Sequence, residues 1–247
     1  MRKNRFLFVA MLFAALSLGF VSCDNDNGLD DNKQDGKKNG HPYVDLGLSV
    51  KWATCNVGAS SPEDFGDYFA WGEVKPKENY GEETYRYSST ENYENMTKYC
   101  TNSNDGIVDN KTILELKDDA AAVNMGGNWR MPTCNEWREL LLYCTWQKEI
   151  RRGKYGPIRG FKITSNVKGY TESSIFLPAA GDCYGNINDI VNENVAIYWT
   201  SELRLDRSSC ALIFIGHCFL SSEEELSPYV GDSMERGLGN SVRGVCP

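Results

Sequence analysis

The residues that can act as nucleophiles, bases or soft metal ligands in this sequence are nine cysteines and two histidines, His41 and His217. His217 directly precedes Cys218, the one place where an imidazole and a thiol are adjacent in sequence. The surrounding segment has the composition of a β-strand, on which neighbouring side chains point to opposite faces. This pair is therefore poorly placed as a thiolate–imidazole couple, and we expect His217 to be structural or exposed.

Other signatures of catalysis do not occur in the sequence. It has no His-Glu-x-x-His zinc helix, no Gly-x-Ser-x-Gly elbow and no phosphate-binding Gly-Lys-Ser/Thr loop. Residues 223–225 are three consecutive glutamates beside serines, which is typical of a solvated loop. Catalytic carboxylates instead need distinct environments that separate their pKa values. We expect no enzymatic activity, no cofactor and no bound metal.

The cysteine count permits disulfides without specifying them, because eight cysteines remain when Cys23 is set aside. Cys134 and Cys144 would lie roughly 15 Å apart on one predicted helix, beyond the limit of ~7 Å between Cα atoms. Cys210 and Cys218 would lie roughly 26 Å apart along one predicted strand. Neither pair can close on itself. The alternative that several cysteines are small buried hydrophobic residues stays open.

The amino-terminal residues have the form of a lipoprotein signal peptide. Three basic residues precede an apolar stretch over 6–21, which is shorter than the roughly 20 residues of a membrane span. The stretch ends at Ser22 and Cys23 in a sequence that resembles a lipobox, in which a peptidase cuts before an acylated cysteine. We predict a signal peptide over 1–22 and a lipid on Cys23, which would hold the chain to the membrane.

Residues 23–40 are predicted to be a disordered tether, since Asn, Asp, Gly and Lys dominate and almost nothing apolar can be buried. Acidic residues directly after Cys23 resemble the surface-export signal of Bacteroidetes lipoproteins. An outer-membrane lipoprotein, exposed on the cell surface, is therefore the expected localisation.

The charge of the chain argues against a nucleic-acid partner. Loss of Arg2, Lys3 and Arg5 with the signal peptide would take the formal net charge from −8 to −11. Nucleic-acid binding needs clustered basic residues, whereas here only 151–154 are clustered, and we interpret these as a solvated turn.

Two helices are predicted before a series of strands. Thr133 and Glu136 form a capping box, and Trp137, Leu140 and Cys144 follow at helical spacing. A shorter helix is predicted over 118–124, ended by the glycine pair at 126–127. Extended runs are predicted in a hairpin over 43–55, and at 67–73, 160–164, 174–178, 196–201, 211–215 and 241–245. This order predicts an α+β fold with a mainly antiparallel sheet in one domain over 41–247.

Several short motifs together resemble the Fibrobacter succinogenes major paralogous domain family found in Bacteroides surface lipoproteins. The resemblance rests on Tyr43–Ala59, Tyr68–Glu73, Trp129–Thr133, Phe176–Gly181, Tyr198–Ser201 and Ser241–Arg243. It implies a C-type lectin-like fold in which the amino- and carboxy-terminal strands are adjacent and irregular loops carry the binding surface. Fold alone does not specify what is bound.

Two activities found among proteins of this fold receive little support from the residues. Calcium-dependent sugar binding uses paired carboxylates and amides around a proline, which the loop before Tyr198 lacks. The start of the helix at 130–133 also looks like formylglycine-generating enzymes, but the context of Cys210 and Cys218 does not match their copper-binding pair. A degenerate relative of those enzymes is the weakest alternative.

A non-catalytic binding or adhesion domain for a glycan or an extracellular protein is the favoured hypothesis, and an accessory or tip subunit of a surface assembly is the alternative. A loop insertion over 75–110 and the loop over 182–195 are expected to present the ligand-binding side chains, because tyrosines suit both sugar stacking and protein anchoring. Asp232-Ser233-Met234 resembles a Bacteroidetes O-glycosylation sequon on Ser233. The candidate ligand-binding residues are Tyr80, Tyr85, Tyr87, Tyr184, Asn186, Asn188, Asp189, Asn192, Glu193 and Asn194.

Overall fold

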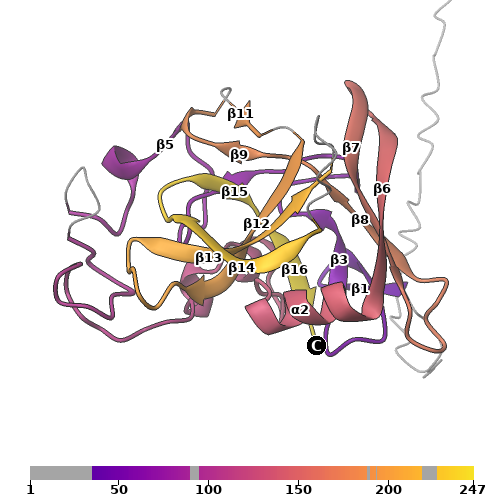
Figure 1. The fold of residues 1–247 in the computed structure, drawn as a ribbon, viewed down its shortest axis with the longest axis horizontal. Helices are drawn as coiled ribbons and strands as arrows, with labels where there is room; N and C mark the ends of the chain where they lie inside the picture. The colour runs from indigo at the N-terminus through magenta and orange to yellow at the C-terminus, as the bar shows by residue number, and fades with distance from the viewer. Residues whose placement is uncertain (1–34, 90–94, 188–189, 193, 219–226) are drawn as a thin grey trace, which may run out of the picture. The chain divides into compact units, whose positions relative to one another are not determined.

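The computed structural model describes residues 35–89, 95–187, 190–192, 194–218 and 227–247, and its centre is the antiparallel pair β12 (Val195–Leu203) and β13 (Cys210–His217) (Figure 1). All residues of β12 except Glu202 are buried, and so are five of the eight residues of β13. Successive side chains of a strand point to opposite faces, so a strand that is apolar at every position must be covered on both sides. The predicted strands at 196–201 and 211–215 are confirmed.

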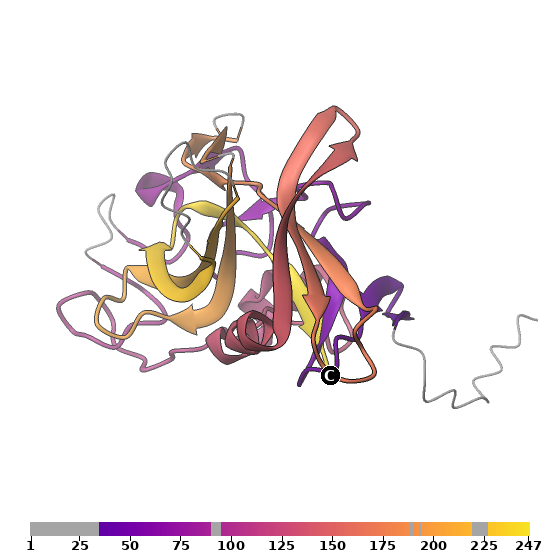
Figure 2. The same cartoon turned by 45° about the vertical axis from the view of Figure 1, so that its right-hand side comes forward.

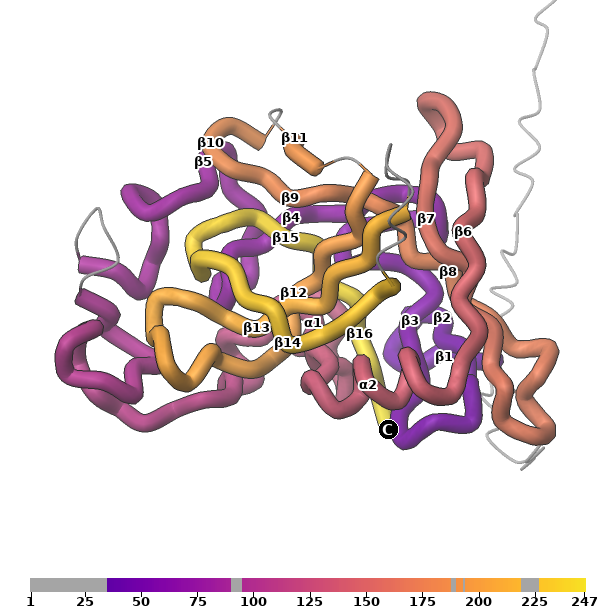
Figure 3. Tube along the Cα trace, in the orientation of Figure 1, coloured from indigo at the N-terminus to yellow at the C-terminus, as the bar shows by residue number. Residues whose placement is uncertain are grey.

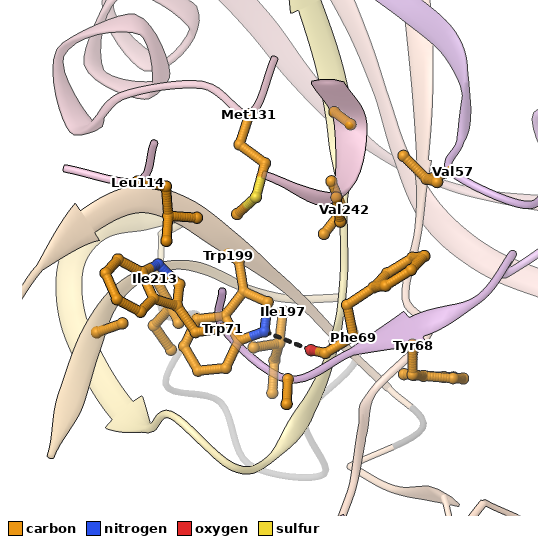
Figure 4. Close-up of a cluster of buried hydrophobic side chains, with 14 of the residues drawn as sticks. Val57, Tyr68, Phe69, Trp71, Leu114, Met131, Ile197, Trp199, Ile213 and Val242 are labelled. Atoms are coloured by element: carbon orange, nitrogen blue, oxygen red, sulfur yellow. Dashed lines mark hydrogen bonds between the residues drawn. The ribbon is translucent and has the colours of Figure 1, made fainter. Parts of the chain in front are cut away.

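The two faces of β12 contribute to two separate hydrophobic clusters. Ile197 and Trp199 belong to the first cluster, in which the Trp199 indole N–H donates to the Phe69 carbonyl at 2.7 Å (Figure 4). Ala196 and Tyr198 belong to the second, which also contains Trp137. The alternation of side chains along one strand therefore divides the core into two.

The described strands form four sheets, the largest of which contains the central pair. The largest has the order β11-β9-β15-β12-β13-β14, with β4 paired to β15; the others are β1-β2-β3-β16, β6-β7-β8 and β5-β10 (Figure 3). The bounds of the remaining strands are β1 Asp35–Lys38, β2 His41–Val44, β3 Lys51–Asn56, β4 Tyr68–Phe69, β5 Asn79–Tyr80, β6 Cys144–Gly153, β7 Gly156–Ser165, β8 Ser174–Pro178, β9 Asp182–Cys183, β10 Gly185–Asn186, β11 Ile190–Val191, β14 Tyr229–Glu235, β15 Gly239–Ser241 and β16 Arg243–Cys246.

The predicted α+β, C-type lectin-like arrangement is wrong, because the structure is built mainly from strands. Among the described residues there are sixteen strands but only two α-helices, α1 (Ala120–Met125) and α2 (Cys134–Tyr143). Glycine at 126 ends α1 after six residues, and α2 ends where β6 begins. The first and last sheet-forming regions do lie together, since β3 pairs with β16, but this pairing occurs within a fold of several sheets.

The predicted start of α2 is confirmed in detail. The Thr133 side chain accepts from the backbone of Glu136, and the Glu136 carboxylate accepts from the backbone N–H of Thr133 at 2.7 Å. Trp137 is fully buried, and its ring stacks on Phe214 at 4.4 Å between centroids. The cap thus fixes where the helix begins, and with it the position of Trp137 in the second cluster.

Three predicted boundaries need correction. Part of the predicted tether, Asp35–Lys38, forms β1 and pairs with β2, because a polar segment can still add backbone hydrogen bonds to an existing sheet. Cys144 begins β6 and is not on the helix. The basic residues at 151–154 are not an isolated turn, since Arg151 to Gly153 end β6 and pair with β7.

The β6–β7 pair is a long hairpin that extends beyond the rest of the fold. All ten residues of β6 are in register with β7, from Cys144 opposite Ser165 to Gly153 opposite Gly156. Figure 2 shows the turn end of the hairpin standing clear of the other strands. Tyr155 lies in this turn and is 90% exposed.

The predicted loop insertion at 75–110 is held by a buried cation. Arg236 is fully buried, and its guanidinium donates to the Tyr85 hydroxyl at 2.8 Å and to the Tyr99 carbonyl at 3.1 Å. It also lies 4.9 Å from the Trp71 ring. Tyr85 in turn donates to the Trp71 carbonyl at 2.8 Å. The segment is therefore packed against the core by polar contacts that need buried tyrosines.

Replacement of Tyr85 with phenylalanine is expected to destabilise the protein. The variant lacks the hydroxyl that accepts from Arg236 and donates to the Trp71 carbonyl. Loss of both hydrogen bonds should lower the free energy of unfolding by roughly 1–3 kcal/mol. Tyr184→Phe, which removes an exposed hydroxyl, should change it by less than about 0.5 kcal/mol. Denaturant unfolding of both variants measures this, and equal losses would show that the Arg236 contact contributes nothing specific.

A buried carboxyl joins α1 to the strand-like segment before α2. Asp119 caps α1 by accepting from the Ala122 N–H at 2.9 Å, and it accepts from the Met131 N–H at 2.8 Å. Burial raises the pKa of Asp119 to about 6, although these backbone donors oppose the change. The folded state therefore binds a proton at Asp119 over a pH range in which the unfolded chain has released it.

This raised pKa predicts a pH-dependent difference between the protein and its Asp119→Asn variant. As the pH rises from about 4 to 6, the free energy of unfolding of the parent should fall by roughly 2 kcal/mol relative to that of a variant with no titrating group at this position. Urea unfolding of both proteins at pH 4, 5, 6 and 7 gives the difference between their free energies of unfolding. The contributions of the other titrating groups cancel, because both proteins contain them. The free energy of unfolding of the parent minus that of the variant should fall as the pH rises. If this difference stays constant or increases, the pKa of Asp119 is not raised.

Candidate functional site

Two adjoining depressions around Tyr184 form the candidate site, here called the Tyr184 groove. Their volumes are about 380 and 230 Å³, and they share Glu82 and Tyr184. The groove is lined by Asn79, Tyr80, Gly81, Glu82, Glu83, Thr84, Asp182, Tyr184, Gly185, Glu235 and Leu238.

Tyr184 is held on both sides by strands although its side chain is 63% exposed. On one side, β9 pairs with β15 of the large sheet; on the other, β10 pairs with β5 (Figure 3). Gly185 has a φ of 80°, a left-handed conformation that favours glycine and lets the chain turn from one sheet to the other. The structure thus presents an exposed aromatic ring on a fixed backbone.

The turn after β5 leaves space for this ring. Glu82–Thr84 form a short 3-10 turn directly after Gly81. A Cβ at Gly81 would lie 3.6 Å from the Tyr184 ring, so the ring lies beside the glycine backbone in van der Waals contact range. Thr84 stabilises the turn, since its hydroxyl donates to the Asn79 carbonyl at 2.9 Å. The Gly81 backbone and the Tyr184 ring therefore lie side by side in the wall of the groove.

The described lining residues of the groove include acidic side chains but no basic one. Glu82, Glu83 and Glu235 retain exposed carboxylate surface, and Arg207, which does not line the groove, lies 3.7 Å from Glu235. Asp182 is buried beneath them. Burial raises the pKa of Asp182, and the Asn192 amide, which donates to its carboxylate at 2.6 Å, opposes this effect. The groove therefore offers hydrogen-bond acceptors and a negative potential.

Three of the tyrosines predicted to bind ligand, which were expected to be exposed, are buried, so the prediction of their exposure is wrong. Tyr80, Tyr85 and Tyr87 belong to the first hydrophobic cluster. Tyr80 forms part of the groove floor, where its hydroxyl lies close to the Tyr68 carbonyl, and burial raises its pKa to about 12. Their rings fill the space between the 75–110 segment and the core, since this segment has few other large apolar side chains.

The predicted residues of the second loop have different positions. Asn186 is exposed on β10, opposite the groove residue Asn79, whereas Asn192 is exposed but is used to bind Asp182. Asn194 is exposed outside the groove lining. Asn188, Asp189 and Glu193 lie outside the described residues.

Sequence reasoning missed the acidic members of the groove. Glu82 and Glu83 stand in an irregular acidic segment, and Glu235 ends β14, more than 150 positions away. A Gly-Glu-Glu turn beside a tyrosine is a weak signal for Glu82. Nothing local marks Glu235, because only the pairing of β14 with β13 brings it to this end of the sheet.

The cysteines and histidines form no metal site in the described part of the chain. Its eight cysteines are all free thiols, and Cys134, Cys144, Cys210 and Cys218 are buried. Ser233 is partly buried on β14, where its hydroxyl accepts from Arg204 at 2.7 Å. Cys23 and the glutamates at 223–225 fall outside the described residues.

Comparison of this chain with protein-family models, curated proteins and solved structures finds no match. The family resemblance of the sequence motifs stays a prediction. In the part of the chain that the structure describes, no helix has both the length and the apolar character needed to cross a bilayer.

Proposed function

We propose that this protein is a surface lipoprotein that binds glycans in the Tyr184 groove, without catalysis. The observation that carries the proposal is an exposed tyrosine whose backbone is fixed by strands on both sides, in a groove that several carboxylates also line. Aromatic rings contact the apolar face of a sugar, and ionised carboxylates accept hydrogen bonds from its hydroxyls.

The charge of the groove specifies the class of glycan. Carboxylates at Glu82, Glu83 and Glu235 repel sialylated, uronic or sulfated chains, whereas neutral sugars donate hydroxyl hydrogens to them and amino sugars add a favourable charge. Because strands on both sides already fix the backbone that carries Tyr184, little backbone entropy is lost when a sugar binds.

Glycan-array binding by the full chain in detergent tests this proposal. We expect neutral or amino-sugar glycans to bind, and Tyr184→Ala to weaken binding at least about tenfold, as for a residue that contributes ~1.4 kcal/mol. Tyr155→Ala removes an even more exposed tyrosine outside the groove and is the matched control. Preference for acidic glycans, or equal loss in both variants, would contradict the proposal. A protein partner without glycan binding would favour an accessory subunit.

The membrane anchor is a separate part of the proposal and rests on the lipobox-like sequence before Cys23. When the full gene is expressed in a Gram-negative host, we expect intact-mass measurement to show cleavage before Cys23 and an acylated residue there. Cys23→Ser should abolish acylation and release the protein from the outer-membrane fraction. An unmodified Cys23 in soluble protein would exclude the anchor and leave glycan binding to be judged separately.

A further inference from the structure

The smaller of the two depressions in the Tyr184 groove is lined mainly by carboxylates. Its volume is about 230 Å³, and it is here called the inner pocket. Its lining residues are Glu82, Asp182, Tyr184, Glu235 and Leu238. The larger depression shares Glu82 and Tyr184 with it. The inner pocket therefore combines three acidic side chains with the exposed aromatic residue.

Backbone hydrogen bonds join the segments that carry the three acidic residues. The Gly81 N–H donates to the Gly237 carbonyl at 3.0 Å, which links the turn that carries Glu82 to the turn after β14. Glu235 is the last residue of β14. Asp182 lies on β9, which pairs with β15 directly after that turn (Figure 3). The acidic residues thus come from distant parts of the sequence but lie on one connected framework.

The charge of Asp182 has no cation to balance it within the described residues. Asp182 is 3% exposed, and its carboxylate accepts from the Asn192 amide at 2.6 Å but forms no ion pair with a described lysine or arginine. The two oxygens of a carboxylate can accept several further hydrogen bonds. Burial of an unbalanced charge is costly, and burial raises the pKa of Asp182 for this reason. A cationic donor bound in the inner pocket would reduce this cost.

The other residues of the inner pocket also favour a positively charged ligand. Glu82 and Glu235 add negative charge where the pocket meets solvent. Arg207 lies 3.7 Å from Glu235, but both side chains are well exposed, so solvent weakens this pair. The face of an aromatic ring such as that of Tyr184 attracts an ammonium group. An amide or hydroxyl donor would gain less, because it carries no charge.

We propose that the inner pocket binds the ammonium group of a sugar unit whose amine is not acetylated. This binding mode rests on the proposed function and specifies the class of glycan. An ammonium group has three N–H donors and a positive charge, which together match Asp182 and the exposed carboxylates. N-acetylation replaces it with a neutral amide. The larger depression, of about 380 Å³, shares Glu82 and Tyr184 with the inner pocket, so a neighbouring sugar unit can occupy it.

Isothermal titration calorimetry of the full chain in detergent, at about pH 6 and low salt, tests this binding mode. Two tetrasaccharides of the same linkage are compared, one of glucosamine and one of N-acetylglucosamine. We expect the glucosamine tetramer to bind at least about tenfold more tightly, because acetylation removes the charge. High salt should reduce this preference, because it screens the exposed carboxylates.

Glu235→Gln removes one charge from the inner pocket with little change of shape. Glu172→Gln is the matched control, since it removes the same charge from an exposed glutamate that lines neither depression. We expect Glu235→Gln to reduce the preference for the glucosamine tetramer about threefold or more, and Glu82→Gln combined with it to reduce the preference further. Glu172→Gln should leave the preference unchanged. Because these glutamates retain exposed surface, their replacement should leave the fold intact.

Tetralysine with an acetylated amino terminus carries the same number of amines as the glucosamine tetramer and measures non-specific attraction to the negative chain. We expect it to bind at least about tenfold more weakly. Equally tight binding of tetralysine, or equal effects of Glu235→Gln and Glu172→Gln, would overturn the proposal. Equal affinity for the two sugar tetramers would also overturn it but would leave glycan binding by the groove intact. Absence of binding to both tetramers and to every glycan on the array would reject the proposed function as well.

Discussion

Two buried guanidinium groups set a constraint on the whole fold. Arg236 and Arg243 are fully buried, and neither forms an ion pair with a carboxylate in the described residues. Removing a cation from water is costly unless its donors are satisfied, so backbone carbonyls must converge on each group. Arg236 donates hydrogen bonds to the Tyr99 and Ser208 carbonyls, and Arg243 donates to those of Ala53 and Phe176. Each arginine thereby joins segments that are far apart in sequence.

The Tyr184 groove depends on one of these connections. Arg236 fixes the segment that leads from Trp71 through Tyr85, and the turn that supplies Glu82 lies within it. Arg236 thus holds an irregular segment in the position in which it forms one wall of the groove. The hydrogen bonds of Arg236 therefore both stabilise the fold and shape the Tyr184 groove.

The sequence predicts those features that depend on neighbouring residues. The capping box at Thr133 and Glu136 locates α2, and runs of β-branched and aromatic residues locate β12 and β13. The lectin-like arrangement was wrong because short motifs do not determine how strands combine into sheets. The predicted exposure of Tyr85 is wrong because the residue is buried against Arg236, which lies 151 positions away in the sequence. The groove also arises from pairing between strands, which composition does not reveal.

The β6–β7 hairpin leaves one long strand edge without a partner among the described residues, since β6 is the outer strand of its sheet. Open edges invite pairing with the edges of other chains. Lys148, Glu149 and Arg151 along β6 oppose it, because alignment of two such edges would bring desolvated charges together. The charges of β6 thus disfavour the pairing of two hairpins along this edge.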